Sequence, residues 1–163
     1  MDLFNLSGKT AVVIGGSSVL GSAMAVALGA YGADVGLVGR DMQRLEEPCA
    51  RIAESGAPTA PFVADATSES DLRRVLTEVI AWTGRVDILF NCAGVNSTTP
   101  FFDLTMAEWD AILDANLKSV VLACQVFGKH MIEQAQGGSI VNISSVSAEV
   151  PLSAERIAAG LGR

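Results

Sequence analysis

Five short apolar runs recur along the chain, and longer segments with helical periodicity separate them. The first four runs begin about 25 residues apart, and each is almost continuously apolar instead of alternating with polar residues. Such runs are typical of parallel strands that are buried on both faces of a sheet. The pattern predicts strands over Thr10–Ile14, Asp34–Val38, Thr59–Ala64, Val86–Asn91 and Ser139–Ile143.

The segments between the runs are long enough for crossover helices, which would connect successive strands in parallel with right-handed crossovers. The sequence therefore predicts the α/β class, with a Rossmann-like, doubly wound parallel sheet of five strands. The helices are expected over Ser22–Tyr31, Met42–Glu54, Glu69–Thr83 and Met106–Gln134.

Two prolines refine this prediction. Pro61 lies inside the third run and suits the start of a strand or an edge strand, because proline has no N–H for a sheet ladder. Pro48 predicts a kink in the second helix or its division into two pieces. The residues suited to cap the second, third and fourth helices are Asp41, Ser68 or Ser70, and Thr105, the last with Glu108 in a capping box.

The fourth predicted helix carries one apolar stripe that contains a single amide, Asn116. A buried amide without partners costs about 1–3 kcal/mol. Water or a backbone carbonyl could satisfy Asn116 in the core, or Asn116 could hold a water near a functional site, and the spacing favours neither. The stripe consists of Trp109, Ile112, Leu113, Leu117, Val120, Val121, Cys124, Phe127 and Met131.

Composition limits the classes of protein to consider. The 163 residues suit one domain, and half of them are hydrophobic, as in a globular protein. The net charge is −7 and no basic run occurs, so neither nucleic acid nor a membrane surface is an expected partner. The chain shows no signal peptide, no long uninterrupted apolar stretch, no metal-ligand spacing and no disulfide framework. We expect a cytoplasmic protein.

The first predicted strand ends in a glycine-rich turn that leads directly into the first helix. Gly15 and Gly16 follow the strand, and two serines and then Gly21 come shortly after. The first N–H groups of a helix are unpaired and carry partial positive charge, and glycines let a ligand approach the backbone. The turn favours a bound phosphate, although a similar turn also occurs as a plain strand–helix connection.

Polar and small residues follow the other predicted strands. Arg40 could accommodate a 2′-phosphate, and Asp65 could accept from an adenine amino group or cap a turn. The small residues of Asn91-Cys92-Ala93-Gly94 would let the backbone pass close to a ligand, and Ser144 and Ser145 follow the fifth strand. Ligands of open α/β sheets bind at this edge, so the sequence predicts a dinucleotide site, with Arg40 favouring NADP(H) over NAD(H).

Taken in order, these residues resemble the short-chain dehydrogenase/reductase family, and within it the branch that acts on sugar acids. The family's glycine-rich fingerprint matches residues 14–21 imperfectly, since Ile14 replaces threonine and Val19 replaces the middle glycine. Its N-N-A-G motif matches residues 91–94, its helix asparagine matches Asn116, and its catalytic serine matches Ser145. The resemblance implies a dinucleotide bound by Gly15, Ser17, Ser18, Leu20, Gly21, Arg40, Asp65, Asn91, Ala93 and Gly94.

The chain departs from the family after the catalytic serine. Where members carry Tyr-x-x-x-Lys, this chain has Ala158 and Gly162, and its single tyrosine is Tyr31. The last helix and two strands of the family fold are also missing. The resemblance therefore implies an incomplete dinucleotide-binding domain over residues 1–153 and a divergent tail over residues 154–163.

In the family, the tyrosine is the general acid/base, the lysine lowers the pKa of the tyrosine, the serine orients the substrate and the asparagine positions a water. The resemblance implies alcohol/ketone interconversion on a sugar acid or polyol in intact relatives, and little turnover by this chain. The alternatives are a noncatalytic dinucleotide-binding or interaction module and a non-functional frameshift product. An open fifth strand and the apolar side of Met106–Gln134 predict association through that helix.

Overall fold

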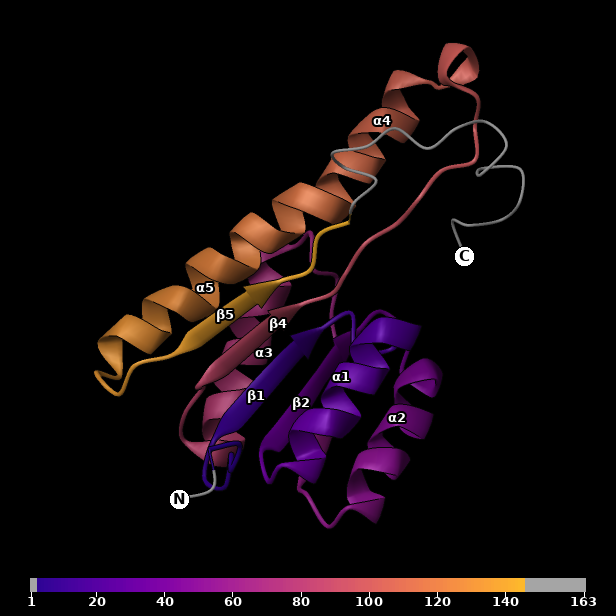
Figure 1. Cartoon of the computed structure of the whole chain (residues 1–163). Helices are drawn as coiled ribbons and strands as arrows, with labels where there is room; N and C mark the ends of the chain where they lie inside the picture. Colours follow the sequence, from indigo (N-terminus) through magenta and orange to yellow (C-terminus); the bar gives the residue numbers. More distant parts are fainter. Residues whose placement is uncertain (1–2, 146–163) are drawn as a thin grey trace.

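The computed structural model describes residues 3–145, so the predicted tail lies outside the described residues. Five strands and the connecting helices follow one another along this range (Figure 1). Their bounds are β1 Thr10–Ile14, α1 Val19–Ala30, β2 Asp34–Gly39, α2 Gln43–Glu54, β3 Thr59–Val63, α3 Glu69–Thr83, β4 Ile88–Asn91, η1 Phe101–Asp103, α4 Met106–Leu113, η2 Asp114–Lys118, α5 Ser119–Glu133 and β5 Ser139–Asn142.

The strands form one parallel sheet in the order β3-β2-β1-β4-β5. This confirms the predicted α/β fold with its five strands. β1 lies at the centre, where Val12 is aligned with Gly36 of β2 and with Leu89 of β4. Pro61 lies in β3, an edge strand, as its missing N–H predicted.

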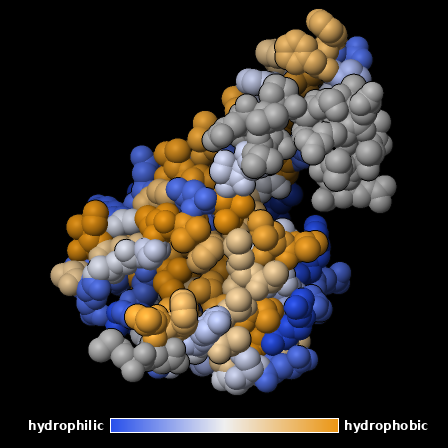
Figure 2. Space-filling model, viewed as in Figure 1, coloured by the Kyte–Doolittle hydropathy of each residue, from blue (hydrophilic) through white to orange (hydrophobic). Residues whose placement is uncertain are grey.

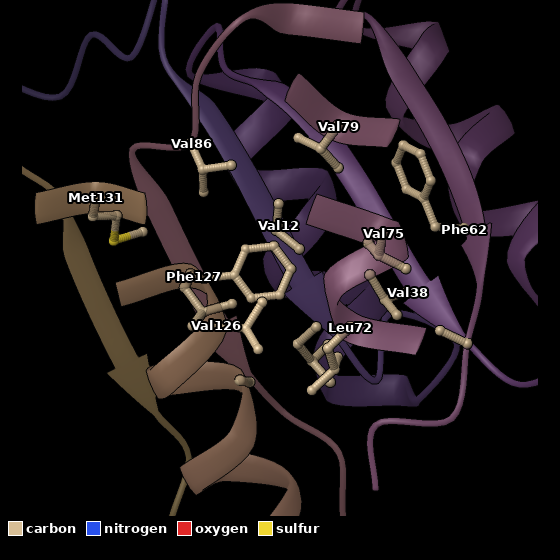
Figure 3. Close-up of a cluster of buried hydrophobic side chains, with 14 residues drawn as sticks. Val12, Val38, Phe62, Leu72, Val75, Val79, Val86, Val126, Phe127 and Met131 are labelled. Atoms are coloured by element: carbon tan, nitrogen blue, oxygen red, sulfur yellow. The ribbon is translucent and has the colours of Figure 1, made fainter. Parts of the chain in front are cut away.

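Helices cover both faces of the sheet. α1 and α2 lie on one face, and α3 and α5 lie on the other (Figure 1). Each face has its own apolar core, because side chains of a buried strand point alternately to the two sides. Val12 and Leu89 contribute to the core that α3 and α5 cover, in which Phe127 and Leu72 are also fully buried (Figure 3).

The second helix corrects one prediction. α2 runs through Pro48 as a single helix and is not divided into two pieces. Pro48 is buried and lies in the second turn, so its missing N–H removes the partner of one carbonyl, that of Arg44. The helix begins at Gln43, so its N-cap is Met42 and not the predicted Asp41, although Asp41 still accepts from the N–H of Gln43 at 2.9 Å.

The fourth predicted helix also differs from its prediction. It is continuous from α4 to α5, but residues 114–118 between them form a turn of π-helix. A π turn adds a residue to the helical repeat and rotates the two halves of an apolar stripe relative to each other. Phe127 and Met131 of α5 are buried, whereas Trp109 and Leu117 are 44% and 59% exposed.

The segment from Gly94 to Lys118, here called the arm, extends beyond the carboxyl ends of the strands (Figure 1). None of the residues of η1, α4 or η2 is buried. By length and composition alone, the continuous helix Met106–Glu133 could cross a membrane. Its C-terminal part packs instead on α3 and the sheet, as a core helix of an α/β fold does.

A buried carboxylate ties together the amino ends of β1 and β4. Asp87 is 5% exposed and accepts from the N–H of Thr10 at 2.9 Å, from Lys9 Nζ at 3.2 Å and from Arg85 Nε at 2.7 Å. Burial alone would raise the pKa of Asp87, but the hydrogen bonds from Arg85, Thr10 and Lys9 outweigh it and hold the pKa below its usual range.

Replacing Asp87 with alanine is expected to lower the free energy of unfolding by about 2 kcal/mol, because the substitution leaves the Thr10 N–H and two cations without their acceptor. Since the pKa of Asp87 is depressed in the folded state, its contribution is present above the unfolded pKa of about 3.9 and is lost as the pH falls further. Urea titrations between pH 3 and pH 7 measure both effects. A constant difference between wild type and variant across this range would contradict the assignment.

Candidate functional site

A hollow of about 190 Å³ lies at the carboxyl edge of the sheet, where β1, β2, β3 and β4 end. The turn after β1 forms one wall, and the turn after β4 forms the opposite wall. Residues that follow β2 and β3 line it between them, and Ala115 and Ser119 of the long helix close one side. The hollow therefore lies where open parallel sheets bind their ligands.

Seven of the ten residues predicted to bind the cofactor line this hollow. Gly21, Leu20 and Asn91 do not line it. The seven lining residues are Gly15, Ser17, Ser18, Arg40, Asp65, Ala93 and Gly94.

The glycine turn brings the ends of β1 and β4 into backbone contact. Gly15 has φ +81°, and a Cβ built on it would stand 2.6 Å from the backbone nitrogen of Ala93. Ser18 then caps α1: its hydroxyl accepts from the N–H of Gly21 at 3.0 Å and donates to the carbonyl of Gly15 at 2.8 Å. The start of α1, with its outward N–H groups, is thereby held against this wall of the hollow.

The three predicted residues outside the hollow have other places. A Cβ on Gly21 would lie 2.3 Å from the carbonyl oxygen of Gly15, so Gly21 permits the helix to approach the turn. Leu20 is 48% exposed in the first turn of α1. Asn91 is 2% exposed and donates to Oδ1 of Asn142 at 2.8 Å, which ties the ends of β4 and β5 together.

Two arginines line the hollow beyond the end of β2. Arg40 and Arg44 are both exposed, and neither forms an ion pair among the described residues. The other described arginines each lie within 4.0 Å of a carboxylate, and these are Arg51, Arg73, Arg74 and Arg85. In a chain with an excess of acidic residues, the two unpaired guanidinium groups make this end of the hollow suitable for an anion.

Asp65 caps the turn that follows β3, which is one of the two roles predicted for it. Its Oδ1 accepts from the backbone N–H of Thr67 at 2.9 Å and from the Thr67 hydroxyl at 2.8 Å. These two hydrogen bonds hold the pKa of Asp65 below its usual range, and the positive charge of Arg40 adds to the effect. Asp65 is thus an ionised, oriented acceptor on the wall of the hollow.

Asn116 is exposed, contrary to its predicted place in a buried stripe, because it lies on the π turn of the arm. Its side-chain amide pairs with the backbone of Val95: Oδ1 accepts from the N–H at 2.7 Å, and Nδ2 donates to the carbonyl at 2.9 Å. Asn116 thereby holds the segment that follows β4, whose Gly94 and Val95 line the hollow. Ser145, the predicted catalytic serine, is exposed and lies three residues after the end of β5.

Sequence reasoning missed several residues of the wall. Arg44, Thr67, Val95 and Ser119 all line the hollow. Arg44 follows Arg40 by four residues, and this spacing was the only available signal for any of them.

Comparisons with known proteins identify the family of this chain. The short chain dehydrogenase family matches residues 9–157. A D-threitol dehydrogenase of Mycolicibacterium smegmatis is 36% identical over 149 residues, which cover 91% of this chain and 57% of that protein. A gluconate 5-dehydrogenase of Gluconobacter oxydans is 33% identical, over 91% of this chain and 58% of that protein.

Solved structures show the same fold. A short-chain type dehydrogenase/reductase from Mycobacterium marinum superimposes with a TM-score of 0.90 at 31% identity, over 93% of this chain and 62% of that one. A metagenomic short-chain oxidoreductase in complex with NADP gives a TM-score of 0.83 at 36% identity, over 96% of this chain and 72% of that one. The chain spans somewhat less than three fifths of the length of the two dehydrogenases above. With the family match covering nearly all of its length and the fold in agreement, this chain belongs to the short-chain dehydrogenase family.

Proposed function

We propose that this chain binds NADP(H) at the carboxyl edge of its sheet. The proposal rests on the hollow at the ends of four strands. The glycine turn, two unpaired arginines and an oriented aspartate all line it. Its volume of about 190 Å³ is below the several hundred Å³ usual for a complete small-molecule site. The described residues therefore suit the adenosine and phosphate half of a dinucleotide.

The glycine turn would hold the pyrophosphate. The backbone from Ser17 to Leu20 leads into α1 and forms its first residues, where the helix dipole favours negative charge. Val19 is 94% exposed and stands where many members of the family have glycine, so we expect the phosphates to rest on backbone N–H groups. Arg40 and Arg44 would bind the 2′-phosphate, which distinguishes NADP(H) from NAD(H).

The double variant R40A/R44A is expected to weaken NADPH binding roughly thirtyfold and NADH binding less than twofold, because only NADPH carries a 2′-phosphate for the two cations. Fluorescence titration of both dinucleotides measures the effect. Arg51→Ala is the matched control, since Arg51 lies on α2 with Arg44 but forms an ion pair with Glu47 at 3.5 Å. An equal loss for NADPH and NADH would contradict the assignment of these arginines to the 2′-phosphate.

The chemistry proposed for the family members that this chain resembles is interconversion of a hydroxyl and a ketone on a polyol or sugar acid. It rests on the activities for which the similar D-threitol dehydrogenase and gluconate 5-dehydrogenase are named. A bound nicotinamide would supply or accept the hydride. This chain contributes Asn116, which holds Val95, and Ser145, but the sequence holds no Tyr-x-x-x-Lys to move the proton.

The purified chain is therefore expected to give negligible turnover of threitol, gluconate or related compounds with either dinucleotide. A missing general acid/base alone lowers a rate by about 10²–10⁴-fold. Absorbance of the reduced nicotinamide at 340 nm measures the reaction. Clear turnover that disappears in Ser145→Ala would contradict the prediction and establish an active enzyme.

A noncatalytic binding or interaction module is the second candidate, and the exposed apolar side of the arm favours it. Leu113 and Leu117 are 39% and 59% exposed, and Phe102 at the tip is 95% exposed. Figure 2 shows apolar residues at the far end of the arm. Surfaces of this kind are typical of sites that contact another protein chain. We propose association through the helix Met106–Glu133.

Sedimentation velocity at micromolar concentration tests this association. The double variant L113D/L117D is expected to be monomeric, because it places charges on the apolar side of the helix, whereas the wild type self-associates. Val63→Asp is the control, since Val63 is similarly exposed at 39% but lies at the opposite edge of the sheet, on β3. A monomeric wild type would contradict the proposed association.

The three cysteines fit a reducing compartment, and we propose a cytoplasmic location. Cys49, Cys92 and Cys124 are all free thiols. Burial raises the pKa of Cys49 and of Cys92, so both thiols stay protonated and poorly reactive near neutral pH.

A further inference from the structure

The arm has two limbs with little to hold them together. One limb is the segment that follows β4, and the other is formed by α4 and the π turn, which run back toward the sheet (Figure 1). Because η1, α4 and η2 bury none of their residues, no apolar core within residues 3–145 fixes the spacing of the limbs. Their arrangement must depend on polar contacts.

Asn116 provides the first of these contacts, near the base of the arm, through its two hydrogen bonds to Val95. Glu108 provides the second, eight residues earlier on the helix and therefore about 12 Å farther along it. Its Oε1 accepts from the Ser97 hydroxyl and from the Thr99 hydroxyl, the latter at 2.8 Å. The Ser97 hydroxyl also accepts from the backbone N–H of Thr99 at 3.0 Å, so one carboxylate oxygen organises the whole turn.

Glu108 was expected to complete a capping box with Thr105, and only half of that box is present. The Thr105 hydroxyl accepts from the N–H of Glu108 at 3.2 Å, but the Glu108 carboxylate reaches across to the other limb. The hydrogen bonds from Ser97 and Thr99 hold the pKa of Glu108 below its usual range, so the side chain is a charged acceptor near neutral pH.

We infer that Glu108 is a positioning residue: by accepting from Ser97 and Thr99, it fixes the segment 94–99 against α4 and so sets the wall that Gly94 and Val95 present to the dinucleotide hollow. It does not itself line the hollow. Asn116 holds the segment at Val95, and Glu108 holds it farther out. Two contacts along a limb fix its direction, whereas a single contact would leave it free to pivot.

Glu108→Ala tests the inference in the full chain. We expect amide hydrogen exchange in residues 95–99 to become roughly three- to tenfold faster, because the carboxylate no longer holds the turn. Glu108→Gln is expected to retain most of the protection, since its carbonyl oxygen accepts from the same two hydroxyls. Asp110→Ala is the matched control: it removes a charge from the same helix at an exposed residue.

The double variant S97A/T99V removes the same hydrogen bonds without altering the helix, and it is expected to reproduce the effect of Glu108→Ala. It also keeps the test valid if Glu108→Ala does not fold. Wild-type exchange rates in both Glu108→Ala and S97A/T99V would overturn the inference, and so would equal acceleration in Glu108→Ala and Asp110→Ala.

The consequence for the dinucleotide rests on the proposed function and has its own measurement. NADPH binding is expected to weaken about threefold in Glu108→Ala and to be unchanged in Asp110→Ala. If the wild type does not bind NADPH, the proposed function fails, while hydrogen exchange still decides the role of Glu108. If the wild type binds and Glu108→Ala binds equally well although its loop exchanges faster, the link from the loop to the hollow is overturned.

Discussion

The backbone contact between the turns after β1 and β4 is the constraint on which the hollow depends. A Cβ on Gly15 would lie 2.6 Å from the backbone nitrogen of Ala93, and φ at Gly15 is +81°, so two independent requirements exclude other residues. The ladder continues up to this contact, since Cys92 donates to the carbonyl of Ile14 at 2.9 Å. Because β1 also pairs with β2, the same contact sets where Arg40 stands relative to the turn after β4.

The described part of the chain joins a densely packed body to an arm in which none of the residues of η1, α4 and η2 is buried. In the body, helices lie on both faces of the sheet and residues such as Val12 and Val13 are fully buried, although three of the four residues of the edge strand β5 are exposed. The arm depends on hydrogen bonds made by Glu108 and Asn116, and opening free energies differ widely between such regions of one protein. The wall formed by Ala93 to Val95 joins the two regions. The end of β4 sets where this wall begins, and the hydrogen bonds of the arm set its direction.

The fold could be predicted from the sequence because buried parallel strands appear as continuous apolar runs, and a proline inside one of them indicated the edge strand β3. The exposed position of Asn116 could not be predicted, because the apolar stripe was read with a uniform helical repeat. The π turn at Asn116 breaks that repeat, and no feature of the sequence indicates it. Arg44 was missed because an exposed helix residue is unremarkable until the fold shows which surface it faces. Of the two effects predicted for Pro48, the division of the helix is wrong, because a proline in the second turn removes only one hydrogen bond of the helix.

The proposed dinucleotide site and the catalytic positions of the family pattern lie in different stretches of the sequence. Among the described residues, those that line the hollow all precede β5, from Ile14 at the end of β1 to Ser119 at the start of α5. Ser145 follows β5, as would any proton-transfer group of the family pattern. Contacts that hold a cofactor equally in the ground state and the transition state add affinity without adding rate. The glycine turn, the two unpaired arginines and the wall held by Asn116 and Glu108 therefore do not depend on the residues that follow β5.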